Sequence, residues 1–215
     1  MKCFARWEKD DNSDVFFRDQ TILQFGQSWD FIASLILLNP GSAQPLNDES
    51  KTEFLRSKNL PFFVEPKGNE KYVEFSIDRL MNDVIKLFSS HYVGGTIRLY
   101  NLFNLKNQNS GEAVSQFKEN MKHPKMFAID SEIKFCDMPV IVASGGNAHN
   151  PDLKNQLIRH IEMAANEKLF VLDKQGPNKF GFKKAKPNKE GFIDSYHPSY
   201  TFKYGNSTNI GELRT

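Results

Sequence analysis

Several features that would point to a particular class of protein are scarce in this chain of 215 residues. Its two cysteines, Cys3 and Cys136, are too few for a disulfide framework and favour a reducing, cytoplasmic setting. No apolar run reaches the roughly 18 residues of a membrane span, and the first residues lack the apolar core of a signal peptide. The five histidines are dispersed, without the spacing of metal ligands. We therefore expect a soluble monomer with no membrane partner, no metal site and no cofactor.

Charge of either sign is in little excess, since the formal net charge is +2 at pH 7. A net charge this small gives no strong positive electrostatic potential of the kind that would indicate a nucleic-acid partner. Hydrophobic residues make up 39% of the chain and charged residues 25%, which is ordinary for a globular protein. The chain has no internal repeat, low-complexity tract or linker, so its length favours a single domain over residues 1–215.

Apolar runs that alternate with helical patterns predict the fold class. Four runs have the composition of buried strands, at residues 31–38, 96–100, 139–143 and 168–172. Apolar residues with helical spacing lie between these runs, at residues 75–90, 111–136 and 151–165. This alternation predicts a three-layer α/β/α domain with a central, mainly parallel sheet of roughly four strands. Residues 1–30 have the pattern of short strands that extend one sheet edge in the antiparallel direction.

Three of the predicted strands end in polar or glycine-rich segments. The first stops at Asn39-Pro40-Gly41-Ser42, where proline lacks a backbone donor and glycine permits a tight turn. The second ends at Asn101, and the third runs into Gly145-Gly146-Asn147. Because the carboxyl ends of parallel strands meet at one edge of the sheet, we expect a ligand site there. We expect His197-Pro198-Ser199 to close the same site.

In this order, the four motifs resemble those of the uracil-DNA glycosylase superfamily, and the resemblance covers roughly residues 31 to 204. Asn39-Pro40-Gly41 looks like the mismatch-specific uracil/thymine branch, in which Asn replaces Asp. His197-Pro198-Ser199 instead looks like the uracil-specific branches. The chain is also similar to a poorly characterised domain family with an Asn-Pro-Ser-x-Ala turn, a following Asp, an Asn-Leu-Phe strand end and a late His-Pro.

The superfamily resemblance implies a monofunctional DNA glycosylase that removes a flipped pyrimidine base and leaves an abasic site. In that reading Asn39 positions the water, Asn101 reads the base edge with its amide, and His197 donates to the departing base. Asp48 is the nearby carboxylate that would supply basicity. Gly41, Ser42 and the ring of Phe103 complete the base-binding set.

Each of these residues also has a structural interpretation. The alternative is a turn cap for Asn39, a helix cap for Asp48 and a strand terminus for Asn101. For His197 it is a hydrogen-bonded turn residue, and for Phe103 it is an ordinary core residue. Two rival functions remain open on the sequence. One is a non-catalytic domain that binds nucleic acid or nucleotides, and the other is a hydrolase of free nucleosides or nucleotides.

Gly41 bears on the choice of base. In the uracil-specific enzymes the residue after the motif's proline is a tyrosine that excludes substituents at pyrimidine C5. By resemblance this chain lacks that tyrosine, which implies that its substrate is a 5-substituted or otherwise enlarged pyrimidine. Removal of such a base serves either repair or defence against modified viral DNA.

DNA contacts are expected around the strand-end loops and in a lysine-rich stretch near the C-terminus. From residue 168 to 205 the chain has eight lysines against three acids, which suits a surface that faces phosphates. The residues expected to contact DNA are Gly145, Asn147, Lys183, Lys184, Lys186, Ser199 and Tyr200.

Replacing Lys183, Lys184 and Lys186 with serine should weaken DNA binding and flatten its dependence on salt. The physical reason is that fewer condensed counterions are released when fewer phosphates are neutralised. Titrations of a labelled duplex at several salt concentrations measure the slope. An unchanged slope would place these lysines away from DNA.

Overall fold

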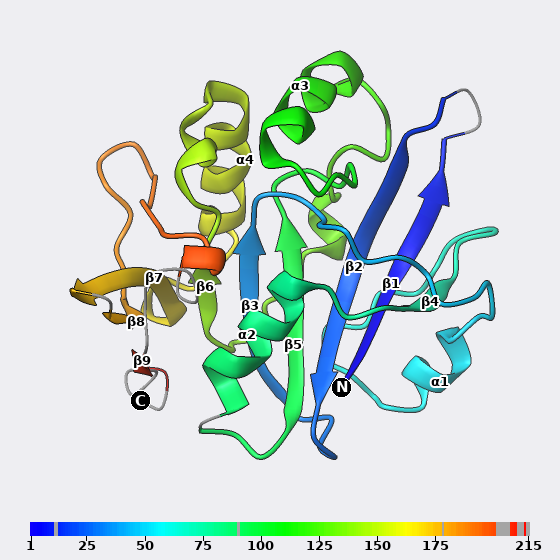
Figure 1. Ribbon diagram of the computed structural model, residues 1–215, viewed down its shortest axis with the longest axis horizontal. Coiled ribbons are helices and arrows are strands. Elements are labelled where there is room, and N and C mark those ends of the chain that lie inside the picture. Colours follow the sequence, from blue (N-terminus) through cyan, green and yellow to red (C-terminus); the bar gives the residue numbers. More distant parts are fainter. Residues whose placement is uncertain (11–12, 90, 178, 201–206, 210–212, 214–215) are drawn as a thin grey trace.

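A computed structural model describes the chain except for residues 11–12, 90, 178, 201–206, 210–212 and 214–215. Residues 201–204, at the end of the stretch that carries the resemblance, lie outside the described residues. The described residues form one sheet of nine strands, in the order β4-β1-β2-β5-β3-β6-β7-β8-β9 (Figure 1). The strands are β1 (Lys2–Lys9), β2 (Phe16–Phe25), β3 (Phe31–Leu37), β4 (Tyr72–Phe75), β5 (Gly95–Asn101), β6 (Val140–Val142), β7 (Leu169–Gly176), β8 (Lys179–Lys184) and β9 (Ser207–Asn209).

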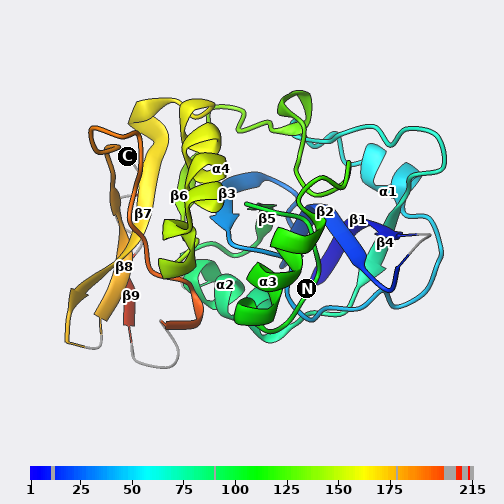
Figure 2. The ribbon, with the colours of Figure 1, turned by 90° about the horizontal axis from the view of Figure 1, so that it is seen from above.

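Helices lie along this sheet, as Figure 2 shows from above. The α-helices are α1 (Thr52–Arg56), α2 (Arg79–Ser89), α3 (Ser110–Asn120) and α4 (Pro151–Glu162). Three short 3-10 helices accompany them, η1 (Asp130–Glu132), η2 (Gly146–His149) and η3 (Asn166–Lys168). Within the described part of the chain, none of the helices has the length and apolarity needed to cross a membrane.

The prediction of an α/β fold around a single sheet is confirmed. The four predicted strands are β3, β5, β6 and β7, which lie side by side in the order β5-β3-β6-β7 and pair in parallel. The segment at residues 1–30 forms β1 and β2, and β2 pairs antiparallel with β5, as expected.

The prediction that the sheet has roughly four strands and is mainly parallel is wrong. The described residues form nine strands rather than about four, and antiparallel pairings join β4 to β1, β1 to β2, β2 to β5 and β7 to β8. The strands that the sequence did not indicate, β4, β8 and β9, are short or rich in lysine and glycine. Such segments become strands because a neighbouring edge offers hydrogen-bond partners, not because of their own apolar pattern.

Strand β3 is the centre of the core, because it pairs with β5 on one edge and β6 on the other. Its side chains alternate between two apolar clusters, one on each face of the sheet. Leu35 and Leu37 belong to the cluster that includes α2. Ile36 and the adjoining Leu38 belong to the cluster that includes α3 and α4. Both faces of β3 are therefore covered, as its continuous apolar sequence requires.

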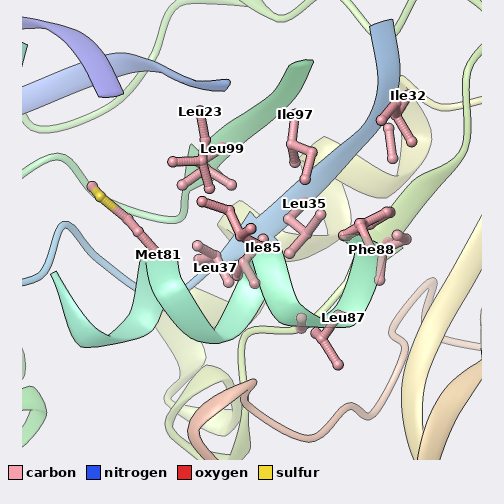
Figure 3. Close-up of a cluster of buried hydrophobic side chains, with 14 of the residues drawn as sticks. Leu23, Ile32, Leu35, Leu37, Met81, Ile85, Leu87, Phe88, Ile97 and Leu99 are labelled. Carbon is pink, nitrogen blue, oxygen red and sulfur yellow. The ribbon is translucent and has the colours of Figure 1, made fainter. Parts of the chain in front are cut away.

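Helix α2 crosses β3 and β5 in Figure 1 and packs its apolar side onto them. Met81, Val84, Ile85 and Phe88 follow the i, i+3, i+4, i+7 spacing of one helix face and are all buried. Figure 3 shows Ile85 and Phe88 on the side of α2 that faces Leu35, Leu37, Ile97 and Leu99 of the strands. Each such burial is worth about 1.5 to 3 kcal/mol. This packing fixes the start of α2 beside the end of β3.

Helix α4 covers the other face of the sheet. The Asn150 side chain accepts a hydrogen bond from the backbone N–H of Asp152, and Pro151 occupies the first helical turn. Near the other end of the helix, His160 is almost fully buried, and its Nδ1 donates to the carbonyl oxygen of Gln156 at 2.8 Å. Because Nδ1 carries the proton, the buried Nε2 is left as an acceptor, and no described residue donates to it.

This histidine predicts acid sensitivity. Burial lowers the pKa of His160 to about 4, whereas in the unfolded chain it titrates near 6.5. The unfolded chain binds more protons between these values, so the free energy of unfolding falls as pH falls through 6.5 towards 4. The loss for this group reaches about 3 kcal/mol in acid.

We expect His160→Phe, which keeps a ring in the same space, to flatten the fall in stability measured by urea denaturation between neutral and acid pH. The fall will not vanish, because burial also lowers the pKa of His197 to about 4. Equal slopes for the wild type and His160→Phe would contradict the assignment.

Candidate functional site

A cavity of about 530 Å³ opens where β3 and β6 end, beside the start of α2; we call it the main cavity. It lies at the carboxyl ends of parallel strands, the edge where open α/β sheets bind ligands. Its volume is within the range of about 300 to 1,000 Å³ that is usual for small-molecule sites. The predicted site residues that line it are Asn39, Gly41, Ser42, Gly145, Asn147, His197, Ser199 and Tyr200.

The Asn39 side chain is held in one orientation by the chain around it. Its amide nitrogen donates to the carbonyl oxygens of Pro40 and Asn107, both at 2.8 Å. With both amide protons engaged, the side-chain oxygen is the group left for a ligand, and no described residue donates to it. Asn39 therefore presents an acceptor to the main cavity, as positioning a water requires.

His197 reaches the main cavity because Gly145 allows a close approach. Gly145 has φ of +75°, and a Cβ atom there would lie 3.0 Å from the Cβ of His197. A side chain at position 145 is thus disfavoured both by backbone conformation and by contact with His197. The Gly145 N–H also donates to the hydroxyl of Ser195 at 3.3 Å. The end of β6 and the segment before His197 are tied together in this way.

The hydrogen bonds of His197 determine which ring nitrogen carries the proton. The backbone N–H of Ser199 approaches Nδ1 at 3.4 Å, and the Ser199 hydroxyl lies 2.9 Å from the same nitrogen. A backbone N–H only donates, so Nδ1 is the acceptor and Nε2 carries the proton of the neutral ring. Burial lowers the pKa of His197 to about 4. At neutral pH His197 is therefore an uncharged donor through Nε2.

Two carboxylates that the sequence analysis missed, Asp78 and Asp83, also line the main cavity. The Asp78 carboxylate accepts the N–H of Ala43 at 3.3 Å and the N–H of Met81 at 2.9 Å. It thereby joins the loop after β3 to the first turn of α2. An aspartate just before an amphipathic helix is a signal for an N-cap and would have indicated this position.

Asp83 differs from Asp78 in its hydrogen bonding. It lies on α2, is only 4% exposed, and no described residue donates a hydrogen bond to its carboxylate. Burial raises the pKa of Asp83, and the nearby Asp78 raises it further, against the lowering effect of Lys86 and Arg79. A carboxylate with a raised pKa in a cavity is a candidate general base. Its signal in the sequence is an acid beside the apolar stripe of a helix.

Asn101 lies in a second, much smaller cavity of about 10 Å³, which we call the inner chamber. Its volume is about that of one water molecule. The inner chamber shares Asn39, Gly41, Asp78 and Leu80 with the main cavity, so the two lie side by side. The Asn101 side chain is nearly buried, and no described residue is hydrogen-bonded to its amide. The side-chain amide of Asn101 is therefore available to form the hydrogen bonds with a base edge that the sequence predicts.

Asp48 and Phe103, two of the predicted site residues, line neither the main cavity nor the inner chamber. The sequence placed Asp48 in the site, but Asp48 is exposed and pairs with Lys71 at 2.7 Å, whereas Asp78 and Asp83 line the main cavity. Phe103 is fully buried and packs on Phe117 with ring centroids 5.0 Å apart. It is a core residue, because its ring belongs to the apolar cluster that includes α3 and α4.

The predicted basic residues lie outside the main cavity as well. Lys183 is in β8 and pairs with Asp173 of the neighbouring β7. Lys184 ends β8 and Lys186 follows it, and both are exposed. These lysines lie on the far side of β6 and β7 from β3. Any contact that they make with DNA therefore lies beside the main cavity rather than in it.

Among the residues that the structure describes, no group of three or more His, Cys, Asp or Glu side chains is arranged to hold a metal ion. Comparison with known proteins found no family model, no curated protein and no solved structure that matches this chain.

Gly41, in the loop after β3, lies against the Asp78 carboxylate, which predicts a specific cost of substitution. A Cβ atom at Gly41 would lie 2.7 Å from Oδ2 of Asp78, whereas one at Gly146 would meet nothing within 4 Å. We expect Gly41→Ala to displace the Asp78 carboxylate, weaken its two backbone hydrogen bonds and lower the free energy of unfolding by about 1 to 2 kcal/mol.

The matched control is Gly146→Ala, since Gly146 lines the same cavity. Chemical denaturation should find its stability within about 0.5 kcal/mol of the wild type. Equal losses in the two variants would show that the contact between Gly41 and Asp78 is unimportant.

Proposed function

We propose that this protein is a monofunctional DNA glycosylase that hydrolyses the N-glycosidic bond of a flipped pyrimidine base and leaves an abasic site. The observation that supports the proposal most is the composition of the main cavity. An acceptor oxygen from Asn39, a carboxylate from Asp83 and a neutral donor from His197 line one cavity, although they come from distant parts of the sequence. Hydrolysis of a glycosidic bond requires these three kinds of group.

The reaction needs a water oxygen to bond to the anomeric carbon of the sugar while the bond from that carbon to the base nitrogen breaks. Asn39 orients the water through its side-chain oxygen, and Asp83 takes the proton that the water loses. The raised pKa of Asp83 makes it a stronger base than an exposed aspartate once it is ionised. These roles replace the one that the sequence had assigned to Asp48.

The electron pair of the broken bond stays on the departing base. His197 stabilises that charge by donating its Nε2 proton in a hydrogen bond to a base oxygen. Its low pKa, about 4, suits this role, because the ring is already neutral and acts as an electrophilic donor rather than as an acid. The base must leave the stack to reach the cavity, and Ser199, Tyr200 and Asn147 line the cavity where phosphates would pass.

The proposal includes a relationship to the uracil-DNA glycosylase superfamily and its three-layer arrangement. It takes the substrate to be a 5-substituted or enlarged pyrimidine, because Gly41 stands where the uracil-specific enzymes have a tyrosine that excludes substituents at C5. It also takes the protein to act as a monomer on DNA in the cytoplasm, in repair or in defence against modified viral DNA.

The test is single-turnover excision, read as alkali-sensitive breaks in duplexes that carry uracil, mispaired thymine or C5-modified cytosine. We expect Asp83→Asn and His197→Ala each to lower the rate by about 10²-fold or more, since each removes a group that acts in the transition state. DNA affinity should change little in either variant.

Asp48→Asn is the matched control, because it removes an exposed carboxylate that pairs with Lys71 outside the cavity. Its rate should equal that of the wild type. A wild-type protein that binds DNA but breaks none of these substrates would favour a non-catalytic binding domain. A loss in Asp48→Asn as large as in Asp83→Asn would remove the cavity carboxylate from the mechanism.

A further inference from the structure

Two aromatic side chains, Trp7 of β1 and Phe16 of β2, stack on one another at the surface; we call them the aromatic pair. Their ring centroids are 4.7 Å apart and their planes are inclined by 14°. Lys9 lies directly opposite Phe16 in the strand register, so Trp7, Lys9 and Phe16 share one face of the sheet. The edge of Trp7 packs against the buried Phe75, which fixes its orientation. Both rings of the pair are only half-buried, so each keeps some surface open to solvent.

Strand direction places the aromatic pair at the same sheet edge as the main cavity. Strand β1 is antiparallel to β2, β2 is antiparallel to β5, and β5 is parallel to β3. Strands β1, β3 and β5 therefore end at one edge, as their arrows show in Figure 1. Trp7 is close to the end of β1 and Phe16 begins β2, so both rings lie at that edge.

The segment after β5 connects the aromatic pair to the wall of the main cavity. The backbone N–H of Lys106 donates to the carbonyl oxygen of Phe16 at 2.8 Å. The next residue, Asn107, lines the main cavity, and its carbonyl oxygen accepts the Asn39 amide at 2.8 Å. Because consecutive Cα atoms are about 3.8 Å apart, the surface of the aromatic pair adjoins the cavity.

A lysine lies over each ring of the aromatic pair. Lys106 Nζ is 5.8 Å from the ring centroid of Trp7, and Lys9 Nζ is 5.7 Å from that of Phe16. Ammonium groups at this distance are attracted by the negative face of an aromatic ring. The same ammonium groups can turn to a phosphate that passes the ring, because lysine side chains are long and flexible.

The two lysines differ in their counter-ions. Lys9 pairs with Asp14 at 3.0 Å, and both side chains are largely exposed, so this ion pair is weak. No carboxylate in the described part of the chain pairs with Lys106. Burial and the neighbouring Arg18 lower the pKa of Lys106, so an anion beside it would favour its charged form. The surface between the aromatic pair and the cavity thus has a cation that lacks a described counter-ion.

Stacked rings with cations beside them suit one kind of partner. Proteins that bind a single nucleic-acid strand place its bases on aromatic rings and its phosphates on nearby cations. The bases of a duplex are stacked on one another and are not open to a protein ring in this way. The arrangement therefore favours an unpaired strand over a duplex.

We propose, on the basis of the glycosylase function above, that Trp7, Phe16 and Lys106 bind the unpaired strand that adjoins the flipped nucleotide. A base of that strand stacks on the open surface of the aromatic pair. Lys106 contacts its phosphate, and Lys9 turns from the Phe16 ring to the phosphate beyond. The strand then leads directly into the main cavity, where the target base is held.

The test measures binding of a strand without pyrimidines, so that excision plays no part. The probe is a labelled oligodeoxyadenylate of about 12 nucleotides, alone and paired with its complement, and binding is read by fluorescence anisotropy. We expect the single strand to bind more tightly than the duplex. Phe16→Leu, which keeps an apolar side chain, should weaken single-strand binding about 10-fold, because stacking on one ring is lost. Its affinity for the duplex should equal that of the wild type.

Two further measurements address the other residues of the surface. Lys106→Gln should reduce the slope of log affinity against log salt by about 0.7, the contribution of one phosphate contact to a single strand. The chain has two tryptophans, so in Trp29→Phe the emission comes from Trp7 alone. We expect the oligodeoxyadenylate to quench that emission, since a base stacks beside the indole.

Phe54→Leu is the matched control. The Phe54 ring is also partly exposed, and Lys58 Nζ lies 4.6 Å from its centroid. Lys2, the first residue of β1, lies over the same ring, so Phe54 is at the opposite edge of the sheet. Phe54→Leu should bind the single strand as the wild type does.

The outcomes separate this surface from the glycosylase activity. Single-strand binding that weakens in Phe16→Leu and Lys106→Gln, without excision of any base, would overturn the glycosylase proposal and retain the surface. Excision with unchanged single-strand affinity in both variants would overturn the surface and retain the glycosylase. No binding of the single strand, or an equal loss in Phe54→Leu, would also overturn the surface. Should Phe16→Leu fail to fold, the salt slope of Lys106→Gln and the emission of Trp7 decide the question.

Discussion

The structure depends most on the burial of β3, which has a strand on each edge and an apolar cluster on each face. A strand so enclosed has no solvent-facing side, which is why all its residues except Ser34 are apolar. Where the apolar run ends, at Asn39-Pro40-Gly41, the chain has to leave the sheet at the edge where β6 also ends. The main cavity exists because these two chain exits flank the start of α2.

Asp78 links this constraint to the site. Its carboxylate accepts backbone N–H groups from both the loop after β3 and the first turn of α2. Helix α2 is in turn held by the burial of Met81, Val84, Ile85 and Phe88, so its position is set by core packing (Figure 3). The same helix carries Asp83 into the main cavity. The packing of α2 in the core therefore sets the positions of Asp78 and Asp83 in the main cavity.

The polar groups of the site differ in how they are prepared for a ligand. Asn39 and His197 have their other hydrogen-bonding atoms occupied, which leaves one defined acceptor and one defined donor. Arg18 and Thr21 are left with donors unpaired among the described residues, at the cost of stability. The two cavities therefore combine groups held in one orientation with buried donors that the described residues leave unpaired.

Local sequence patterns were sufficient for the parallel core and for most of the cavity loops. The apolar run of β3 and the Asn-Pro-Gly turn define a buried strand and its end, and the carboxyl ends of parallel strands meet by geometry alone. Asn39 and Gly41 were found in this way, whereas His197 was singled out by the late His197-Pro198-Ser199 motif. The antiparallel strands β4, β8 and β9 were not, because an edge strand is stabilised by its neighbour rather than by its own pattern.

Tertiary structure alone decided which carboxylates and cations line the two cavities. Asp48 is closest to the turn in sequence, yet it points to solvent, while Asp83 arrives from a helix whose rotation is set by the core. Arg18 and Thr21 share the inner chamber because one extra residue at Gln20 reverses the side-chain alternation. No pattern along the chain encodes that reversal, since a bulge forms only when β2 is aligned with β1.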